Sequence, residues 1–571
     1  MQAFGMKFFL CISVFLGVFC LWSPVFAEEK PPENFDTTAE LIRLLREKGI
    51  ISEGEAGNFL ERYQQQAQAT PQVVTITPAQ GQEEYLQEIS KDVTDKVTRD
   101  LNDMKQGVDR RADDLAKTNR QLKEKLDQLE AVVKKDHGKK LEKSSWAQRI
   151  RFGGDIRLRQ ESVLFDKGNA RDIEDPSSPN TLVNTTNDEH RQRIRLRVGM
   201  KADLIEPGDI NVGKTEAGVR VATGSVGNPV STNHTLGHAS NDKSDIVLDQ
   251  AYLRWSYIPT EGILGKKPKI SVTGGIMENP FYSSSLVFDS DLAFEGAAVN
   301  LVTDTNGFSN GFLTLGYFPL EESEWSQQDK YLVGGQAGIN HHPTFGWEYR
   351  LGAALYEYTK VTGSPIDRVN LTTSDLRQLS AMSPKFMQKG NSTFDMSTSD
   401  TGNKNVTYGL LSEFQLLNLT GRIENTMFAP VHIVLYGDWV KNLGYDPGKM
   451  AEKAGVTPEY MSSISGDRAY LVGLKVGYPK PRQRWDWNLF AEYRYLESDA
   501  VLDAFTDSDF HLGGTNAKGY IFGGELGLYE NVWLGARWMS ANEIKDMQML
   551  GDTQTNDLAV DTIQIDINAE F

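Results

Sequence analysis

The chain has 571 residues, of which 39% are hydrophobic and 24% are charged, and its formal net charge is −18. This length is too great for one ordinary domain unless the domain is a large barrel or a repeat. A mean hydropathy of −0.43 argues against a bundle of membrane-spanning helices, and the acidic balance argues against a nucleic-acid partner.

Residues 1–27 are typical of a secretory signal peptide. Lys7 precedes the apolar run FFLCISVFLGVFCLW, and Val25 and Ala27 stand at the small-residue cleavage positions before Glu28. Cleavage would remove Lys7 and bring the net charge to −19. Retention of this segment as a membrane anchor is the alternative that the same pattern leaves open.

Both cysteines of the chain, Cys11 and Cys20, lie within this segment. A lipoprotein would use Cys20, but bulky Phe19 stands where a small residue is expected. The mature chain is therefore expected to contain no disulfide, no thiolate nucleophile and no cysteine metal site.

Residues 28–70 predict a small helical hairpin. The stretch AELIRLLREKGIISEGEAGNFLERY has leucines at helical spacing, Gly49 ends the first helix, and Ser52 with Glu55 forms a capping box for the second. Because the segment is acidic and exported, docking is a better interpretation than DNA binding. Residues 71–81 follow as a polar linker with prolines.

Residues 82–146 predict a long amphipathic helix. Apolar residues recur from Leu86 to Val133 about every 3.6 positions, and the remaining faces are rich in charge. Such a stripe needs a partner, which favours a coiled coil and self-association. The alternative is a single solvated helix that lies against the base of a barrel.

From residue 147 to the end the hydrophobic period changes to two, which is typical of strands. In the last segment, DTIQIDINAEF, the isoleucines share one face and polar residues take the other. Sixteen stretches have this character: 150–160, 190–204, 214–223, 246–257, 268–277, 294–303, 311–319, 331–340, 345–358, 406–418, 429–441, 467–478, 484–498, 517–529, 531–540 and 560–571.

Two features favour a transmembrane antiparallel β-barrel, an all-β fold over 147–571, rather than a soluble sandwich. Aromatic residues gather near the ends of the apolar faces, and long connections alternate with short ones. With the C-terminus in the periplasm, the longest connection, 359–405, lies outside the cell and residues 28–146 lie in the periplasm.

A ladder of charges occupies the predicted lumen side. Basic residues on the first four strands would face acidic residues on the last four, and closure would bring the two sets together. Two interpretations of these residues remain open. They could pair with one another and only stabilise the wall, or they could create an electrostatic field that favours anions. The predicted pore-lining set is Arg151, Arg157, Arg159, Arg193, Arg195, Arg197, Lys201, Arg220, Arg254, Asp486, Glu492, Glu525, Asp566 and Glu570.

The segments LIRLLREKGIISEGEA, DIRLRQE, RQRIRLRVGMKADL and GGIMENPFYSSSLVFDSDLAFEGAAV resemble the putative porins of Gram-negative outer membranes. The chain departs from that family at Ile276, where a basic residue is frequent. The resemblance implies passive uptake of small hydrophilic solutes through a barrel in the outer membrane. It also implies packing of three such barrels into a trimer.

Enzymatic interpretations are weaker than the channel. His234 and His238 have i, i+4 spacing but lie in a loop rich in Gly and Asn, so no metal site is expected, and no cofactor is implied. A second hypothesis makes the barrel an anchor in the membrane lipid, with the coiled coil contacting the cell wall. The two hypotheses differ in whether the lumen is open, and loop 359–405 could fold inward as a constriction or as a plug.

Overall fold

The computed structural model describes residues 147–169, 173–175, 178–205, 213–237, 245–259, 268–305, 308–323, 329–343, 346–366, 373–396, 407–545 and 558–571, with the single positions 117 and 123. Contacts divide the chain into a unit over 1–133 and a unit over 134–571. The expected signal peptide, hairpin, linker and coiled coil lie outside the described residues. The exceptions are Lys117 and Lys123, which are helical and exposed.

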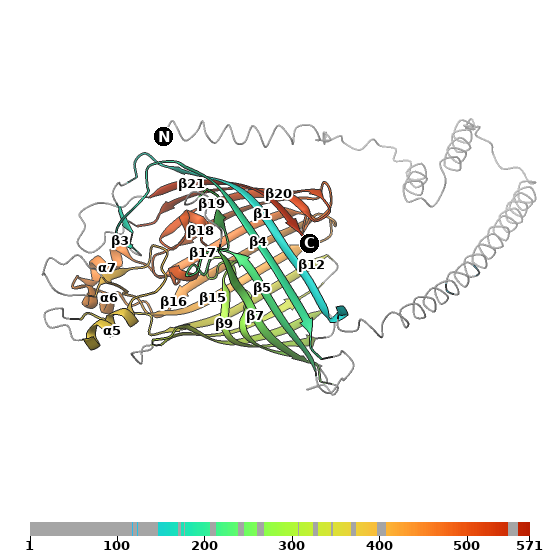
Figure 1. Cartoon of the computed structure of the whole chain (residues 1–571), viewed down its shortest axis with the longest axis horizontal. Helices are drawn as coiled ribbons and strands as arrows, with labels where there is room; N and C mark the ends of the chain where they lie inside the picture. Colours follow the sequence, from blue (N-terminus) through green and yellow to red (C-terminus); the bar gives the residue numbers. More distant parts are fainter. Residues whose placement is uncertain are drawn as a thin grey trace, which may run out of the picture. The chain divides into compact units, whose positions relative to one another are not determined.

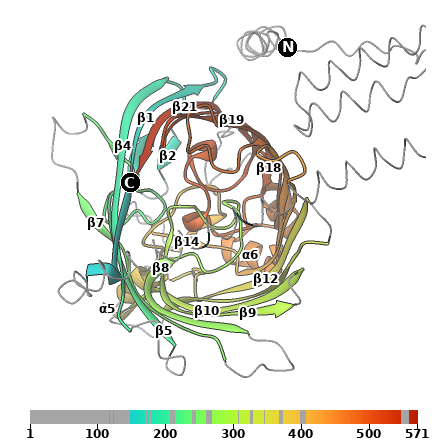
Figure 2. The same cartoon turned by 90° about the vertical axis from the view of Figure 1, so that its right-hand side faces the viewer.

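Sixteen long antiparallel strands close into one barrel (Figures 1 and 2), as the sequence predicts. The last strand pairs with the first, with Asp566 opposite Arg159. The strands are β1 (Ile150–Phe165), β4 (Glu189–Asp203), β5 (Lys214–Thr223), β7 (Ile246–Tyr257), β8 (Lys269–Glu278), β9 (Ala293–Thr305), β10 (Ser309–Glu321), β11 (Lys330–His341), β12 (Trp347–Thr359), β15 (Phe414–Asn425), β16 (His432–Asn442), β17 (Arg468–Gly477), β18 (Trp487–Leu496), β19 (Ala517–Tyr529), β20 (Val532–Glu543) and β21 (Ala559–Glu570).

The alternation of each strand separates an apolar outside from a covered inside. Ile565 and Leu355 point outward and are 48% and 54% exposed, whereas the neighbouring Gln564 and Tyr356 point inward and are 1% and 0% exposed. Exposed aliphatic side chains in such a band suit lipid, which has no hydrogen bonds to offer. Among the described helices, none is long and apolar enough to span a membrane.

The two ends of the barrel differ in their connections. At one end, the short-turn end, segments such as 342–346 and 530–531 join the strands; at the other, the long-loop end, the connections include 360–413 and 443–467. The helices α5 (Thr373–Met382), α6 (Pro447–Ala454) and α7 (Pro458–Ile464) lie at the long-loop end, and the C-terminus lies at the other (Figure 1).

Short elements complete the described chain. They are the 3-10 turns η2 (Ala147–Arg149), η4 (Asp503–Phe505) and η5 (Phe510–Leu512), and the short strands β2 (Ile173–Asp175), β3 (Ser178–Val183), β6 (His234–Thr235), β13 (Thr393–Asp395) and β14 (Tyr408–Leu410).

One predicted strand is shifted. The sequence predicts a barrel strand over 406–418, but the barrel strand β15 spans Phe414–Asn425, and Tyr408–Leu410 instead pairs with β13 inside the long loop. The apolar run YGLLSEFQLLNL does not mark where the wall begins. Leu410 and Leu411 are each 2% exposed because they are buried beneath the loop rather than facing lipid.

Part of the inner wall is apolar. Phe318, Leu332 and Leu471 point inward from β10, β11 and β17, and each is at most 1% exposed. They pack in one cluster with Leu286 and Val501, which come from connections at the long-loop end. These connections therefore fold into the barrel, and the hydrophobic effect holds them there.

Placing a charge on the outer face should destabilise the barrel. Ile565→Arg puts a guanidinium among the exposed aliphatic side chains, at a cost of about 2–4 kcal/mol if the site is near the bilayer midplane. The urea midpoint of the lipid-reconstituted variant should fall accordingly. An unchanged midpoint would mean that Ile565 does not contact lipid.

Candidate functional site

Three segments from the long-loop end, 279–292, 384–392 and 498–516, meet inside the barrel and are called here the inward loops. The Asp289 N–H donates to the Phe505 carbonyl at 2.7 Å, which joins the first to the third. The Thr515 N–H donates to the Lys389 carbonyl at 2.8 Å, which joins the third to the second. Figure 2 shows loop segments within the ring of strands. The lumen is therefore restricted by an interlocked set rather than by a single loop.

The first inward loop is seated on the wall by an aromatic side chain. The Phe281 ring packs edge-on against Tyr356, with ring centres 5.0 Å apart. Gly334 leaves space for the ring, because a Cβ there would lie 2.5 Å from it. The Asp438 carboxylate of β16 accepts hydrogen bonds from the Ser284 N–H at 3.1 Å and from its hydroxyl at 2.6 Å.

The second inward loop belongs to the long connection that the sequence analysis left open between constriction and plug. The Asn391 side chain donates to the carbonyls of Ser498 and Val501 at 2.6 and 2.9 Å. The Gln388 amide donates to the Asp503 carbonyl at 2.7 Å. This part of the loop therefore supports the 498–516 segment inside the barrel.

Arginines of β1 and β4 form a basic wall that faces two loop carboxylates. The guanidiniums of Arg195 and Arg197 pair with Asp291 of the first inward loop at 3.5 and 3.4 Å. Arg159, which is 3% exposed, pairs with Asp509 of the third inward loop at 3.1 Å. The predicted ladder thus anchors the loops as well as lining the wall.

Strand carboxylates pair with the same wall. Asp155 accepts from Arg195 at 2.9 Å and from Arg197 at 2.7 Å. Arg193 lies 3.4 Å from Glu161, and Asp566 accepts from Arg159 at 2.8 Å. Most of the positive charge in the basic wall is therefore compensated locally.

The remaining predicted cations have varied surroundings. Arg151 pairs with Asp203 and Glu216 near the short-turn end, Arg220 pairs with Asp249, and Lys201 is exposed. Arg254 donates to the Thr273 hydroxyl at 3.1 Å. Arg157 donates to the Asn233 side-chain oxygen at 2.5 Å, and among the described residues no carboxylate pairs with it.

The predicted acidic residues accept hydrogen bonds from nearby side chains, with one exception. Glu492 accepts from Arg494, Glu525 from the Asn488 amide at 2.7 Å, and Glu570 from Arg482 at 2.9 Å. Asp486 was assigned to a strand, and this is wrong: it lies in the turn before β18, where its carboxylate accepts the Gln483 N–H at 2.8 Å. Its role is to close that turn.

A second basic group on the far wall was missed. Arg350 of β12 and Arg422 of β15 are direct cross-strand partners. The Arg350 guanidinium lies 3.9 Å from the centre of the Tyr282 ring, and Arg422 pairs with Glu424 at 2.5 Å. Strand parity places both inward, so the alternation of WEYRLG could have identified Arg350 had the basic residues of later strands been considered.

Burial perturbs the titration of the inward loops. Burial raises the pKa of Asp503 to about 7 and that of Asp499 to about 6. It lowers the pKa of Lys389 to about 8. Burial would also raise the pKa of Asp509, but Arg159 and Arg537 hold it well below the usual range. Asp509 therefore stays ionised beside the basic wall, while Asp503 and Asp499 become protonated as the pH falls through about 7 and about 6.

In the described part of the chain, no group of His, Cys, Asp and Glu side chains is arranged to hold a metal ion.

A closed barrel with an apolar outer band and a polar interior narrowed by inward loops is the architecture of an outer-membrane channel. The chain belongs to the putative porin family, whose family model matches residues 35–571. It is therefore a channel of the bacterial outer membrane. A comparison with curated protein sequences gave no match.

Similar solved structures share little sequence with this chain. OprB of Pseudomonas putida is 11% identical with a TM-score of 0.40, and the match covers 76% of this chain and 97% of that one. OmpT of Vibrio cholerae is 9% identical with a TM-score of 0.37, covering 74% and 99%. The channel DcaP of Acinetobacter baumannii is 11% identical with a TM-score of 0.37, covering 74% and 97%.

The raised carboxylate pKa values predict inward loops that are more stable in mild acid. A carboxyl group whose pKa is raised in the folded state binds more protons there than in the unfolded state. Its contribution to the stability of the folded loops therefore falls as pH rises from about 4 to about 7. Amide exchange of residues 384–392 and 498–516 should be slower at pH 5.5 than at pH 8, after correction for intrinsic rates.

Asp503→Asn should remove much of this dependence. The amide can keep accepting the Gln388 N–H, which the Asp503 carboxylate accepts at 3.1 Å, without a buried charge. At pH 8 we expect exchange in this variant to be slower by at least about tenfold, the factor that each unit of pKa shift contributes. Equal exchange at both pH values in the natural chain would refute the titration argument.

Proposed function

We propose that the channel allows passive diffusion of small hydrophilic solutes with a mild preference for anions. The observation that carries the proposal is a pair of inward arginines, Arg157 and Arg350, on opposite walls. Among the described residues, neither has a carboxylate within ion-pair distance. Their fields therefore extend into the lumen, unlike those of the paired arginines.

Charge counting along the basic wall supports the same direction. The wall and Arg537 supply seven guanidiniums, which face six carboxylates. The guanidiniums are those of Arg157, Arg159, Arg191, Arg193, Arg195, Arg197 and Arg537, and the carboxylates are those of Asp155, Glu161, Glu189, Asp291, Asp509 and Asp566. A small positive excess in a restricted aqueous path attracts anions although the whole chain is acidic.

Neutralising the unpaired arginines should weaken the preference. We expect Arg157→Gln with Arg350→Gln to move the zero-current potential toward cation selectivity in a planar bilayer under a salt gradient, most strongly in dilute salt. Lys449→Gln, which removes an exposed charge from α6, is the matched control and should leave that potential unchanged. An equal shift in both would contradict a role for these two arginines.

We also propose an orientation and an assembly. Residues 28–146 lie in the periplasm, and the long-loop end faces the exterior. The stripe from Leu86 to Val133 associates with its copies, most simply in a trimer. The alternation of long and short connections supports the orientation, because outer-membrane barrels have short periplasmic turns.

Cysteine labelling tests the orientation, since the mature chain is expected to lack this residue. A cysteine at Lys449 should react with a membrane-impermeant maleimide on intact cells. One at Lys117 should react only after the outer membrane is opened. Labelling at Lys117 on intact cells would reverse the orientation.

The anchor remains a second proposal, in which residues 82–146 contact the cell wall. Deletion of residues 82–143 distinguishes the two roles. A deletion that leaves conductance intact but releases the barrel from peptidoglycan in a pull-down supports an additional anchoring role. Unchanged retention on peptidoglycan removes that role.

A further inference from the structure

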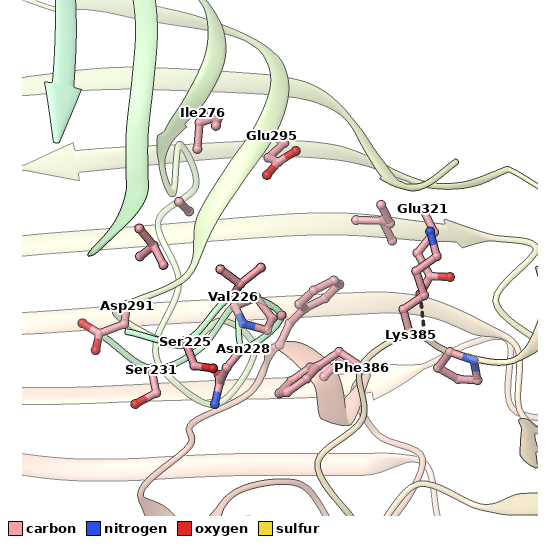
Figure 3. A pocket seen from close by; sticks show the side chains of 18 of the residues that line it. Ser225, Val226, Asn228, Ser231, Ile276, Asp291, Glu295, Glu321, Lys385 and Phe386 are labelled. Atoms are coloured by element: carbon pink, nitrogen blue, oxygen red, sulfur yellow. Dashed lines mark hydrogen bonds between the residues drawn. The ribbon is translucent and has the colours of Figure 1, made fainter. Parts of the chain in front are cut away.

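A cavity of about 600 Å³ lies at the long-loop end, where strands and inward loops meet (Figure 3). It does not suit an anion, because carboxylates outnumber cations in its lining. The lining carboxylates include those of Asp249, Asp291, Glu321 and Asp503, whereas the lining cations are Lys330 and Lys385. An anion that enters the channel meets a more favourable surface on the far wall, toward the short-turn end.

Two guanidiniums of the far wall lie side by side on the lumen face. Arg350 of β12 and Arg422 of β15 are direct cross-strand partners, and both point inward near the short-turn ends of their strands. Direct partners in a sheet have Cβ atoms roughly 4.5–5.5 Å apart, so both guanidiniums can reach one small anion. Arg350 is exposed and the Arg422 side chain is 43% exposed, so both meet the water of the lumen.

Nearby carboxylates compensate this pair only in part. Among the described residues, no carboxylate lies within ion-pair distance of Arg350. Arg422 pairs with Glu424 at 2.5 Å, but the same carboxylate accepts a hydrogen bond from the His432 ring at 2.6 Å. Glu348, the direct partner of Glu424, forms no ion pair with either guanidinium. Like charges at opposed positions destabilise a sheet, so an anion between Arg350 and Arg422 would offset a repulsion.

A tyrosine of the first inward loop holds one of the two guanidiniums. The Arg350 guanidinium lies 3.9 Å from the centre of the Tyr282 ring. The Gln336 amide accepts the Tyr282 N–H and donates to its carbonyl, both at 2.7 Å, and Gly352 leaves space for the ring, because a Cβ there would lie 3.2 Å from it. A ring contact uses a face of the guanidinium and leaves the N–H groups at its edge for a ligand.

The Tyr282 hydroxyl adds a third donor. Among the described residues, this hydroxyl has no hydrogen-bond partner. Burial raises the pKa of Tyr282, while Arg350 and Arg422 each act to lower it, so both guanidiniums lie within electrostatic reach of the hydroxyl. A phosphoryl group presents three acceptor oxygens and up to two negative charges, whereas a carboxylate presents two oxygens and one charge. Three donors with two positive charges therefore match a phosphoryl group better than a carboxylate.

We propose that Arg350, Arg422 and Tyr282 form a binding site for the phosphoryl group of small hydrophilic solutes, free phosphate or a phosphate ester. The inference rests on the proposed channel function, because it names a class of anion that the channel admits. The basic wall contributes no residue to this site.

Four probes test the chemistry of recognition. Glucose 6-phosphate, glucuronate and glucose share a sugar ring, and inorganic phosphate carries the phosphoryl group alone. Each sugar is added to both sides of the full chain in a planar bilayer, and the concentration that halves the ionic current is measured. Glucose 6-phosphate should block at the lowest concentration. Block by glucuronate at an equal or lower concentration, or no block of a conducting channel, would overturn the proposal.

Inorganic phosphate distinguishes the two sources of the group. It should compete with glucose 6-phosphate and raise its half-blocking concentration more than chloride does at equal ionic strength. The ratio of the two phosphate concentrations shows whether the free ion or the ester binds more tightly. Block by glucose 6-phosphate that is indifferent to inorganic phosphate would refute recognition of the phosphoryl group.

Variants separate the three donors. Arg350→Gln and Arg422→Gln should each raise the half-blocking concentration of glucose 6-phosphate about fivefold, the effect of one exposed ion pair. Tyr282→Phe keeps the ring against Arg350 and removes only the hydroxyl. It should raise the value for glucose 6-phosphate about fivefold, the effect of one hydrogen bond, and leave that for glucuronate unchanged.

The matched control is Lys475→Gln, which removes an inward cation from β17, two strands away from Arg422. We expect the half-blocking concentration of glucose 6-phosphate to change less than about twofold, because a charge at that distance acts only through a screened field. A loss as large as that in Arg350→Gln would mean that any cation of the wall serves, and the site would be refuted.

A chain without conductance would refute the channel function and leave the phosphoryl site to be tested separately. Titration calorimetry of glucose 6-phosphate with the detergent-solubilised full chain then decides. Binding that weakens in Arg350→Gln and Tyr282→Phe supports the site, and absence of binding refutes it.

Discussion

The interior depends on how the positive charges of β1 and β4 are compensated. The strand register places Arg157 directly opposite Arg195, and Arg159 opposite Arg193. Like charges at directly opposed positions destabilise a sheet. Carboxylates of the inward loops, Asp291 and Asp509, lie against these arginines and offset the repulsion. The wall and the loops therefore stabilise each other, and a substitution in either should destabilise both.

The opposite half of the barrel holds the same loops by different physics. There apolar inward side chains of β10 to β17 form one cluster, and the loops cover it with Phe281, Leu286 and Val501. Apolar burial favours contact between loop and wall but does not depend on orientation. The ion pairs and the hydrogen bond from Ser284 to Asp438 do depend on it, so they fix the position of the loops. An inward loop held on one side by packing and on the other by charge is confined across the lumen.

The strands could be predicted from the sequence because lipid imposes a strict period of two on each of them. The DTIQIDINAEF strand is a clear case, with Ile563, Ile565 and Ile567 all exposed on the outer face. The predicted range of β15 was shifted because the apolar run of this strand continues into a loop that is itself buried. The alternation of apolar and polar residues becomes less regular wherever a loop, rather than lipid, covers the side chains.

The inward loops could not be derived from periodicity, because they have none. A signal was nevertheless present: the connection ENPFYSSSLVFDSD has Phe281, Leu286, Val287 and Phe288, too many apolar residues for a solvated loop. Pairing of individual arginines also could not be derived, since Asp291 and Asp509 meet the wall only through tertiary folding. Sequence parity can place a residue on the inner face without identifying the group that faces it.

Paired and unpaired arginines act on a solute over different ranges. A pair such as Arg197 with Asp155 has no net charge, and its field falls off faster with distance than that of a single charge. It can orient a dipolar solute that passes close by, but it attracts no ion from far away. An unpaired guanidinium acts over about one Debye length, roughly 8 Å at physiological salt. Because Arg157 and Arg350 extend from opposite walls, their ranges cover more of the lumen than two neighbours on one strand would. Selectivity in this channel should therefore depend less on how many arginines the wall contains than on which of them the loops leave without a carboxylate.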